Sequence, residues 1–329
     1  MRKKLLSFVA LAAIVFLGAC SNEELLPEPD QTFTFSATMP DDNPTTRVTL
    51  TEEGKAIALR WEIDDVMDVV IIQGTETAVG TAKIDSTTIT PDGKRARFNP
   101  QVSGGNINPN LPFNFYGVYG GRGLASTNPT NALLPEDPSA SRSLDEVQDN
   151  EDVMLYFAHE GITSSDVATG VTLNHLGSLF KITLRNNCTT GTLNLEQGAQ
   201  LEGINNPGAE DWAYDFSTVG TVFDLTTQTF QNTGTGINSM SFTTNTATIA
   251  PGEEATYWSW YPVLEDNTWP ELKLILVDAA GDPIENLETV NSKTRTTPIV
   301  AGRNYRFYAA FDGTDLNFTD DQLGVPVEP

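Results

Sequence analysis

Apolar and polar residues alternate with a period of two along many short stretches of this chain. Residues 32–38 read Thr-Phe-Thr-Phe-Ser-Ala-Thr, and residues 48–51 and 57–61 alternate on either side of a polar turn. A period of two places every second side chain on one face of a strand, so these stretches predict half-buried β-strands, the last two joined as a hairpin. The apolar runs at 69–72 and 113–119 predict two further strands that are more deeply buried.

The same pattern continues in the second half of the chain. Alternating or apolar stretches there predict strands at residues 180–185, 257–261, 272–277 and 305–311. Helix signals are few, although Ser143 and Glu146 have the spacing of a capping box and predict one short helix. Many short strands separated by turns favour an all-β fold built from antiparallel sandwiches.

The length of the chain predicts two such sandwiches. At 329 residues the chain is longer than a single sandwich domain needs. A stretch of small and polar residues between 161 and 170 separates two strand-rich regions, so we place the join near residue 165. The prediction is an N-terminal β-sandwich over 31–165 and a C-terminal β-sandwich over 166–329.

The first residues have the pattern of a secretory signal. Three basic residues at 2–4 precede an apolar run at 5–17, which is shorter than the roughly 20 residues of a membrane-spanning helix. Residues 17–20 (Leu-Gly-Ala-Cys) resemble a bacterial lipobox, in which the cysteine is acylated and becomes the first residue. We predict a signal peptide over 1–19 and lipidation of Cys20. An ordinary signal peptide that happens to contain a cysteine is the alternative.

The segment after the cysteine, residues 20–30, is predicted to be a lipidated tether. Acidic residues follow directly at 23 and 24, as in lipoproteins that the Bacteroidetes carry to the cell surface, and a solvated linker is the simpler alternative. Two or three acyl chains make a stable anchor. We therefore expect the protein at the outer membrane and cell surface, held by its lipid.

Charge argues against two classes of partner. The chain has 19 basic and 44 acidic residues, a formal net charge of -25. A surface of this kind repels phosphate backbones, so we expect no nucleic-acid binding. It also disfavours lying on anionic lipid, which leaves the acyl chains as the expected membrane attachment.

Recognisable catalytic and metal-binding motifs are missing from the sequence, although carboxylates are numerous. The sequence has no nucleophile elbow, no zinc-binding helix motif and no phosphate-binding loop. His159, His175 and the lone thiol of Cys188 are expected to be structural. The aspartates at 64, 65 and 68 lack the regular oxygen spacing of a calcium loop. We expect no metal, no cofactor and no enzymatic activity.

Two tryptophans in the second half allow two interpretations. Trp258 and Trp260 alternate with tyrosines over residues 257–261, so the two indoles share one face of the predicted strand. Such rings can stack on sugars, which makes both residues candidate glycan contacts. The alternative is that they fill the core of the C-terminal domain, as large aromatic side chains usually do.

Taken in order, several motifs resemble the fimbrillin family, pilus-subunit lipoproteins of the Bacteroidetes. The motifs lie at residues 33–38, 46–50, 61–69, 173–182 and 299–305. Together with the lipobox they extend over nearly the whole chain. The resemblance implies two transthyretin-like β-sandwich domains in tandem and a structural or adhesive role in a cell-surface pilus, with other pilus subunits as partners.

The resemblance also implies how the subunit assembles. In the family, a protease cuts after an arginine beyond the first strand, and a strand of a neighbouring subunit then fills the vacated groove. Here the matching residues are Arg47 as the candidate processing site and Phe33 and Phe35 on the displaced strand. The next arginine, Arg60, is expected to be protected inside a strand. The strand-donating tail is expected within residues 315–327. Whether the subunit serves as stalk, anchor or tip stays open.

A non-polymerising surface glycan-binding lipoprotein is the alternative function. It shares the signal, the acidic tether and the β-rich body. Oligomerisation separates the two hypotheses, because a pilus subunit forms ladders after proteolysis, whereas a lectin stays monomeric and binds glycans saturably.

Overall fold

The protein was analysed as a computed structural model. The chain divides into two compact units, Met1–Gln31 and Thr32–Pro329. The structure describes residues 34–40, 51–53, 56–85, 87–135, 143–149, 152–195, 198–204, 221–231, 237–243, 248–263, 270–278, 280, 282–292 and 299–319. All of these residues belong to the second unit.

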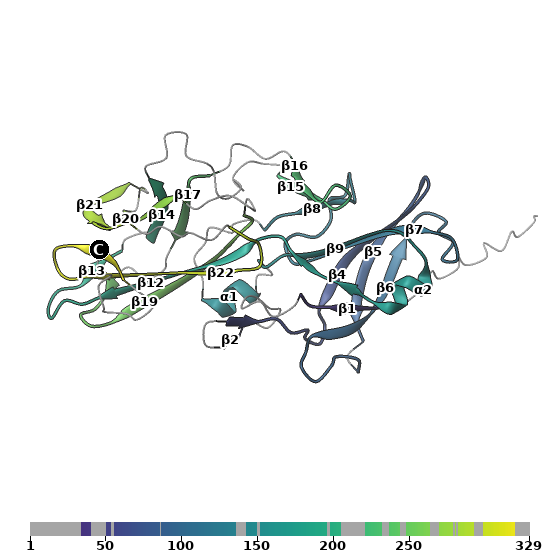
Figure 1. The fold of residues 1–329 in the computed structure, drawn as a ribbon, viewed down its shortest axis with the longest axis horizontal. Coiled ribbons are helices and arrows are strands. Elements are labelled where there is room, and N and C mark those ends of the chain that lie inside the picture. Colours follow the sequence, from purple (N-terminus) through teal and green to yellow (C-terminus); the bar gives the residue numbers. More distant parts are fainter. Residues whose placement is uncertain are drawn as a thin grey trace, which may run out of the picture. The chain divides into compact units, whose positions relative to one another are not determined.

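The first half of this unit forms an eight-stranded sheet, in the order β10-β1-β6-β5-β4-β7-β9-β11 (Figure 1). Its strands are β1 (Phe35–Thr38), β4 (Val66–Gln73), β5 (Glu76–Ile84), β6 (Arg95–Ser103), β7 (Phe113–Tyr119), β9 (Leu155–Ile162), β10 (Val171–Thr172) and β11 (Asn174–His175). Its pairs are antiparallel apart from β1 with β10. The buried strands predicted at 69–72 and 113–119 are confirmed as β4 and β7.

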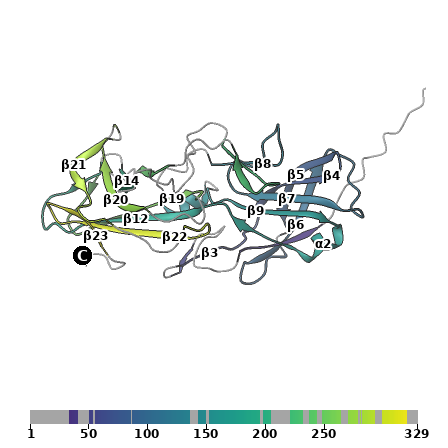
Figure 2. The ribbon, with the colours of Figure 1, turned by 45° about the horizontal axis from the view of Figure 1, so that its top comes forward.

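The second half forms two four-stranded sheets, β19-β12-β22-β23 and β17-β14-β20-β21 (Figure 2). Their strands are β12 (Ser178–Asn186), β14 (Gly198–Ile204), β17 (Ser239–Thr243), β19 (Glu254–Tyr261), β20 (Glu271–Val277), β21 (Pro283–Glu288), β22 (Asn304–Phe311) and β23 (Leu316–Thr319). In the first of these sheets β12 runs antiparallel to β19 and parallel to β22. The four strands predicted here from alternation or apolar runs are confirmed.

Three smaller sheets complete the strands: β13-β18, β16-β15-β8 and β2-β3. They comprise β2 (Thr51–Glu53), β3 (Ala56–Ala58), β8 (Asn131–Leu133), β13 (Leu193–Asn194), β15 (Val222–Asp224), β16 (Thr229–Gln231) and β18 (Thr248–Ile249). The antiparallel pair β2-β3 confirms the predicted hairpin. In the sheet β16-β15-β8, a strand of the first half pairs with a strand of the second.

The two helices among the described residues are short, and each begins with a capping box. α1 (Leu144–Asp149) follows Ser143, whose N–H donates to Glu146 Oε2 at 2.7 Å, while the Glu146 N–H donates to Ser143 Oγ at 3.2 Å. These reciprocal bonds confirm the predicted box. α2 (Ser164–Thr169) follows Thr163, whose N–H donates to Asp166 Oδ2 at 2.8 Å. α2 lies in residues 161–170, which were predicted to be a polar connection without a helix.

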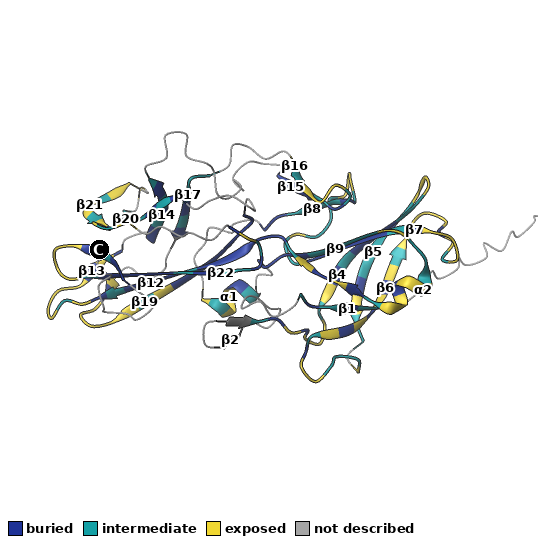
Figure 3. Cartoon of the chain, viewed as in Figure 1, coloured by how far each residue is buried: buried dark blue, intermediate teal, exposed yellow. Residues whose placement is uncertain are grey.

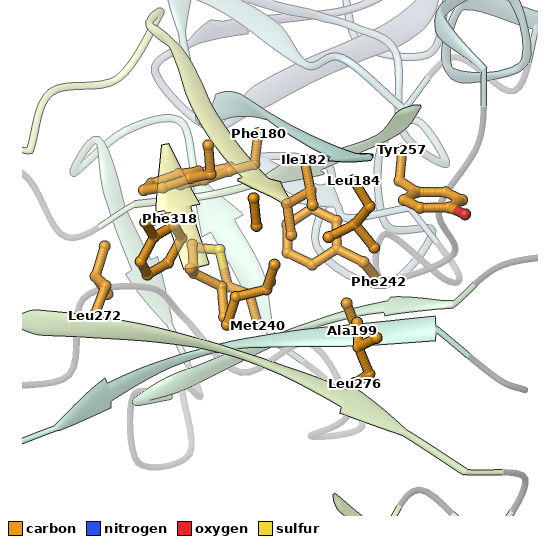
Figure 4. Packing of buried hydrophobic residues seen from close by; sticks show 14 of the residues in the cluster. Phe180, Ile182, Leu184, Ala199, Met240, Phe242, Tyr257, Leu272, Leu276 and Phe318 are labelled. Carbon is orange, nitrogen blue, oxygen red and sulfur yellow. The ribbon is translucent and has the colours of Figure 1, made fainter. Parts of the chain in front are cut away.

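The two halves each have a hydrophobic core. The N-terminal core gathers buried side chains of β1, β4, β6, β7 and β9, among them Phe35, Met67, Phe98, Phe115 and Phe157. The C-terminal core lies between the two four-stranded sheets, with Phe180, Ile182 and Phe318 on one side and Ala199, Met240 and Leu276 on the other (Figure 4). This second core has the face-to-face packing of a β-sandwich.

A third buried group, here called the middle cluster, connects the two halves. Its members are Val70, Tyr116, Val118, Ala132, Leu134, Val147, Val153, Met154, Leu176, Leu179, Phe223, Leu225, Trp258 and Trp260. They come from β4 and β7 of the first half, from β12, β15 and β19 of the second, and from α1. Because these strands bury both faces, buried residues run in succession along β7 and β19 (Figure 3).

The all-β prediction is confirmed, but the division into two separate sandwich domains stays a prediction. Residues 32–329 form one compact unit. Within it, strand pairing places β10 and β11 with the first sheet, although both follow the predicted join at 165. The second half's own sheet begins with β12 at Ser178.

Candidate functional site at the first strand

β1 lies between two other strands of the first sheet. It pairs antiparallel with β6, from Phe35 opposite Phe98 to Thr38 opposite Arg95. On its other side it pairs parallel with β10, where Ala37 lies opposite Val171. β1 is therefore an inner strand of the sheet, next to the two-residue edge strand β10; Figure 1 labels β1 and β6.

Phe35 fills the groove beneath β1. The side chain is 1% exposed, and its ring centroid lies 5.5 Å from that of Phe98, 5.1 Å from Phe115 and 5.8 Å from Phe157. These three rings belong to β6, β7 and β9, so Phe35 joins distant strands of the sheet. Burying one phenylalanine side chain contributes about 1.5–3 kcal/mol. Removing β1 would leave an aromatic pocket with no occupant.

Hydrogen bonds secure β1 near its carboxyl end. The indole N–H of Trp61 donates to the carbonyl of Ala37 at 3.1 Å. The Leu173 N–H donates to the Thr38 carbonyl at 3.0 Å, and the Met39 N–H donates to the Lys94 carbonyl at 2.9 Å. Most of these bonds use the main chain of β1, so they do not depend on which side chains the strand carries.

The end of α2 packs against β1. Arg95 Nη2 donates to the Thr169 carbonyl at 3.0 Å. Gly170 follows with a φ of 110°, and a Cβ at this position would lie 3.0 Å from the Ser36 carbonyl oxygen. The backbone angle favours glycine, and the close approach would make any side chain tight here. The end of α2, a helix that the sequence pattern did not predict, therefore packs beside β1.

The structure describes one of the four residues predicted for strand removal and anchoring. Phe35 is in place in the groove, whereas Cys20, Phe33 and Arg47 lie outside the described residues, so their roles stay predictions.

The expectation for Arg60 needs correction. β3 ends at Ala58, so Arg60 lies beyond the strand and is exposed. The contact here is with Gly93 instead: the Trp61 N–H donates to the Gly93 carbonyl at 2.7 Å, and a Cβ on Gly93 would lie 2.5 Å from Arg60 Cβ. Arg60 is thus an exposed residue that packs against Gly93, outside any strand ladder.

The predicted donor segment also needs correction in part. Leu316 and Phe318 lie in β23, where they are 0% and 1% exposed and belong to the C-terminal core. Their side chains are already used inside this chain, so they are not spare residues for a neighbour's groove. The remainder of the tail, residues 320–329, lies outside the described residues.

Trp258 and Trp260 share one face of β19, as predicted, but that face points away from the C-terminal core. They are 4% and 1% exposed and belong to the middle cluster. Lys181 Nζ lies 4.8 Å from the Trp258 ring centroid. The structure thus favours a packing role over the glycan-contact hypothesis for these two rings, although in a different cluster from the one expected.

Several titratable groups outside the candidate site are buried or hydrogen-bonded within the fold. Burial lowers the pKa of His175 to about 4 and also lowers the pKa of His159. Burial, with a hydrogen bond to Glu160, raises the pKa of Tyr116 to about 12. Asp65 accepts hydrogen bonds from the Glu62 N–H and the Tyr119 hydroxyl. Over the residues that the structure describes, no group of three or more potential ligands could hold a metal ion.

Comparisons with known proteins give structural neighbours at low identity. No protein-family model matches the chain, and no curated protein matches it in sequence. A protein assigned to cell adhesion from Bacteroides uniformis is similar with a TM-score of 0.44 and 13% identity, covering 88% of this chain and 96% of its own. Among the described residues, no helix is long and apolar enough to cross a membrane.

Two further neighbours are fimbrial proteins of Porphyromonas gingivalis. The tip fimbrial protein Mfa3, with a C-terminal truncation, has a TM-score of 0.35 and 9% identity and covers 88% of this chain and 97% of its own. The fimbrial anchor protein Mfa2 has a TM-score of 0.35 and 8% identity and covers 87% of this chain and 95% of its own.

Proposed function

We propose that this chain is a non-enzymatic subunit of a cell-surface pilus of the fimbrillin type, exported as a lipoprotein and assembled by replacement of its first strand. The order of motifs along the sequence supports the family assignment. The observation that carries the mechanism is the position of Phe35, which β1 inserts among three aromatic rings of other strands.

Strand replacement fits the way β1 is held. β1 has four residues, and its main-chain bonds with β6 and β10 can be formed by any extended segment. If proteolysis after Arg47 removes it, β6 is left with an unpaired edge beside an apolar pocket. A strand from a second subunit then restores both the ladder and the buried ring. Because such a contact is head-to-tail, it generates a filament instead of a closed dimer.

The same cut would change how the protein is attached. Cys20 precedes Arg47 in the sequence, so cleavage after Arg47 would separate a lipid on Cys20 from residues 48–329. The proposal is that the lipid delivers the subunit to the outer membrane and the cell surface, and that the cut converts a tethered monomer into a polymer-competent one. Partners are further copies or other subunits of the pilus.

The donated segment is proposed to lie within residues 320–329. β23 keeps Leu316 and Phe318 in the C-terminal core, so donation starts after Thr319. The segment contains Leu323, Val325 and Val327, which alternate with other residues and match the period of a strand.

The experiment is digestion of the full chain by an arginine-specific protease. Cleaved products are analysed by N-terminal mass spectrometry and by gel electrophoresis without boiling. Wild type is expected to give a new N-terminus at Val48 and a ladder of oligomers. The matched variants are Arg47→Lys, which removes the cut site and should abolish the ladder, and Arg60→Lys, which should leave it. Cleavage after Arg47 without a ladder would overturn the polymerisation mechanism.

A further inference from the structure

The segment that follows β21 closes one side of the C-terminal sandwich. Thr289 is fully buried; its N–H donates to the Leu274 carbonyl at 2.8 Å, and its hydroxyl accepts from the Leu274 N–H at 3.1 Å. Thr289 also forms a parallel bridge with Leu316. Leu274 belongs to β20 and Leu316 to β23, so this one residue joins the two sheets that enclose the core.

Asn291, two residues later, binds the main chain of β23 with its side chain. Nδ2 donates to the Phe318 carbonyl at 3.1 Å, and Oδ1 accepts from the Phe318 N–H at 2.7 Å. The Val290 N–H donates to the Leu316 carbonyl at 2.9 Å. An amide can make both bonds because it carries a donor and an acceptor side by side, as a peptide group does.

These bonds occupy the edge of β23 that faces away from β22. On its other edge β23 pairs with β22, from Phe311 opposite Leu316 to Tyr308 opposite Thr319. An exposed strand edge would invite another strand to add there. Here a side chain takes the place of that strand at Phe318, so the edge is satisfied within the subunit.

We propose that Asn291 is a positioning residue that latches β23 into its own sheet and makes Thr319 the fixed point from which the C-terminal segment leaves. The second part rests on the proposed function, because it matters only if residues 320–329 are donated. The latch would give strand exchange a defined start, because β23 stays with its own core and donation begins after Thr319. It also prevents a foreign strand from pairing at Phe318.

Hydrogen–deuterium exchange on the uncleaved full chain tests the latch. Asn291→Ala removes both side-chain bonds, and Asn291→Asp keeps the size but sets a carboxylate against the Phe318 carbonyl. Amides in peptides covering 316–319 are expected to exchange about tenfold faster in Asn291→Ala, and by a smaller factor in Asn291→Asp, whose carboxylate can still accept from the Phe318 N–H. The matched control is Asn317→Ala on the same strand, whose half-buried side chain lies on the other face. It should leave the exchange unchanged.

The test depends on which peptides exchange faster in the variants. Unchanged exchange at 316–319 in Asn291→Ala would show that pairing with β22 and burial alone hold β23, and the latch would be wrong. Equal acceleration across β12, β14 and β20 would identify Asn291 as a general stabilising residue, which also overturns the proposal. Peptides from β4 and β7 report whether each variant is folded.

Protease-triggered assembly separates this proposal from the function on which it rests. If wild type forms ladders, those of Asn291→Ala are expected to dissociate at a lower temperature than those of Asn317→Ala. Identical dissociation temperatures would contradict Thr319 as the fixed point. If wild type forms no ladder, the proposed function fails, while the exchange measurement still decides the latch.

Discussion

At the scale of single residues, Phe35 is the side chain on which the proposed mechanism depends most. Phe35→Ala removes a fully packed ring from the N-terminal core and leaves a cavity among Phe98, Phe115 and Phe157. We expect the free energy of unfolding to fall by about 3–5 kcal/mol, measured by urea denaturation. Leu111→Ala is the control, because that side chain is 55% exposed and should change stability by less than about 0.5 kcal/mol. A loss below about 1 kcal/mol for Phe35→Ala would contradict its place in the groove.

His175 predicts a pH dependence at the same scale. Burial and the charge of Lys94 hold its pKa at about 4, below the ordinary 6.5. Between these values the unfolded chain binds a proton that the folded chain does not, so the free energy of unfolding falls as the pH falls from 6.5 towards 4. Since the ring keeps some exposure, we expect about 1–3 kcal/mol from this group.

The comparison variant for that dependence is His175→Gln, which lacks the titrating ring. Denaturation curves at pH 7 and pH 4.5 should show a smaller loss for His175→Gln than for wild type or for His159→Gln. Equal losses in the three proteins would show that the carboxylates alone set the acid sensitivity.

At the scale of elements, α1 depends on its capping box. The helix carries Val147, which is 0% exposed, into the middle cluster. Ser143→Ala leaves the Glu146 N–H without its side-chain acceptor, and we expect a loss of about 0.5–2 kcal/mol in chemical denaturation. Ser143→Thr keeps a hydroxyl and should restore most of the stability. A full loss in Ser143→Thr would mean that packing, not capping, sets the effect.

The strands were predictable where one face or both faces have a regular pattern. β4, β7 and β22 were found because continuous or alternating apolar residues identify buried strands without knowledge of their partners. α2 was missed although Thr163 and Asp166 have capping-box spacing, because its six residues contain one buried apolar side chain, Val167, and no periodic pattern. The capping-box spacing of Thr163 and Asp166 was the one local signal for this helix.

Hydrophobic periodicity does not predict which strands pair when they are far apart in the sequence. Nothing local in Val171–Thr172 indicates that this pair lies beside β1, or that β8 pairs with β15. The sequence therefore predicted that Phe35 lies on the displaced strand, but not which strands and rings surround it. Likewise, β23 was predicted to be part of the donated tail. Its four residues include two apolar side chains, and the sequence alone does not reveal that both are buried in the C-terminal core.

At the scale of the whole molecule, the middle cluster predicts cooperative unfolding. It draws side chains from both halves, and β8 pairs with β15 across them. We expect one calorimetric transition for residues 32–329. Phe98→Ala in the N-terminal core and Phe307→Ala in the C-terminal core should both move that single transition to lower temperature. Two transitions, each shifted by one variant, would show that the halves unfold independently.

The parallel pairing of β12 with β22 has a mechanical consequence. The two strands remain in register from Leu179 opposite Asn304 to Asn186 opposite Phe311. A load applied along these strands slides one past the other and strains the whole ladder at once, whereas a load that peels an edge strand breaks one bond at a time. We therefore expect the pair to act as a shear joint, so that the resistance of the protein to a load along these strands depends on this joint more than on the total free energy of folding.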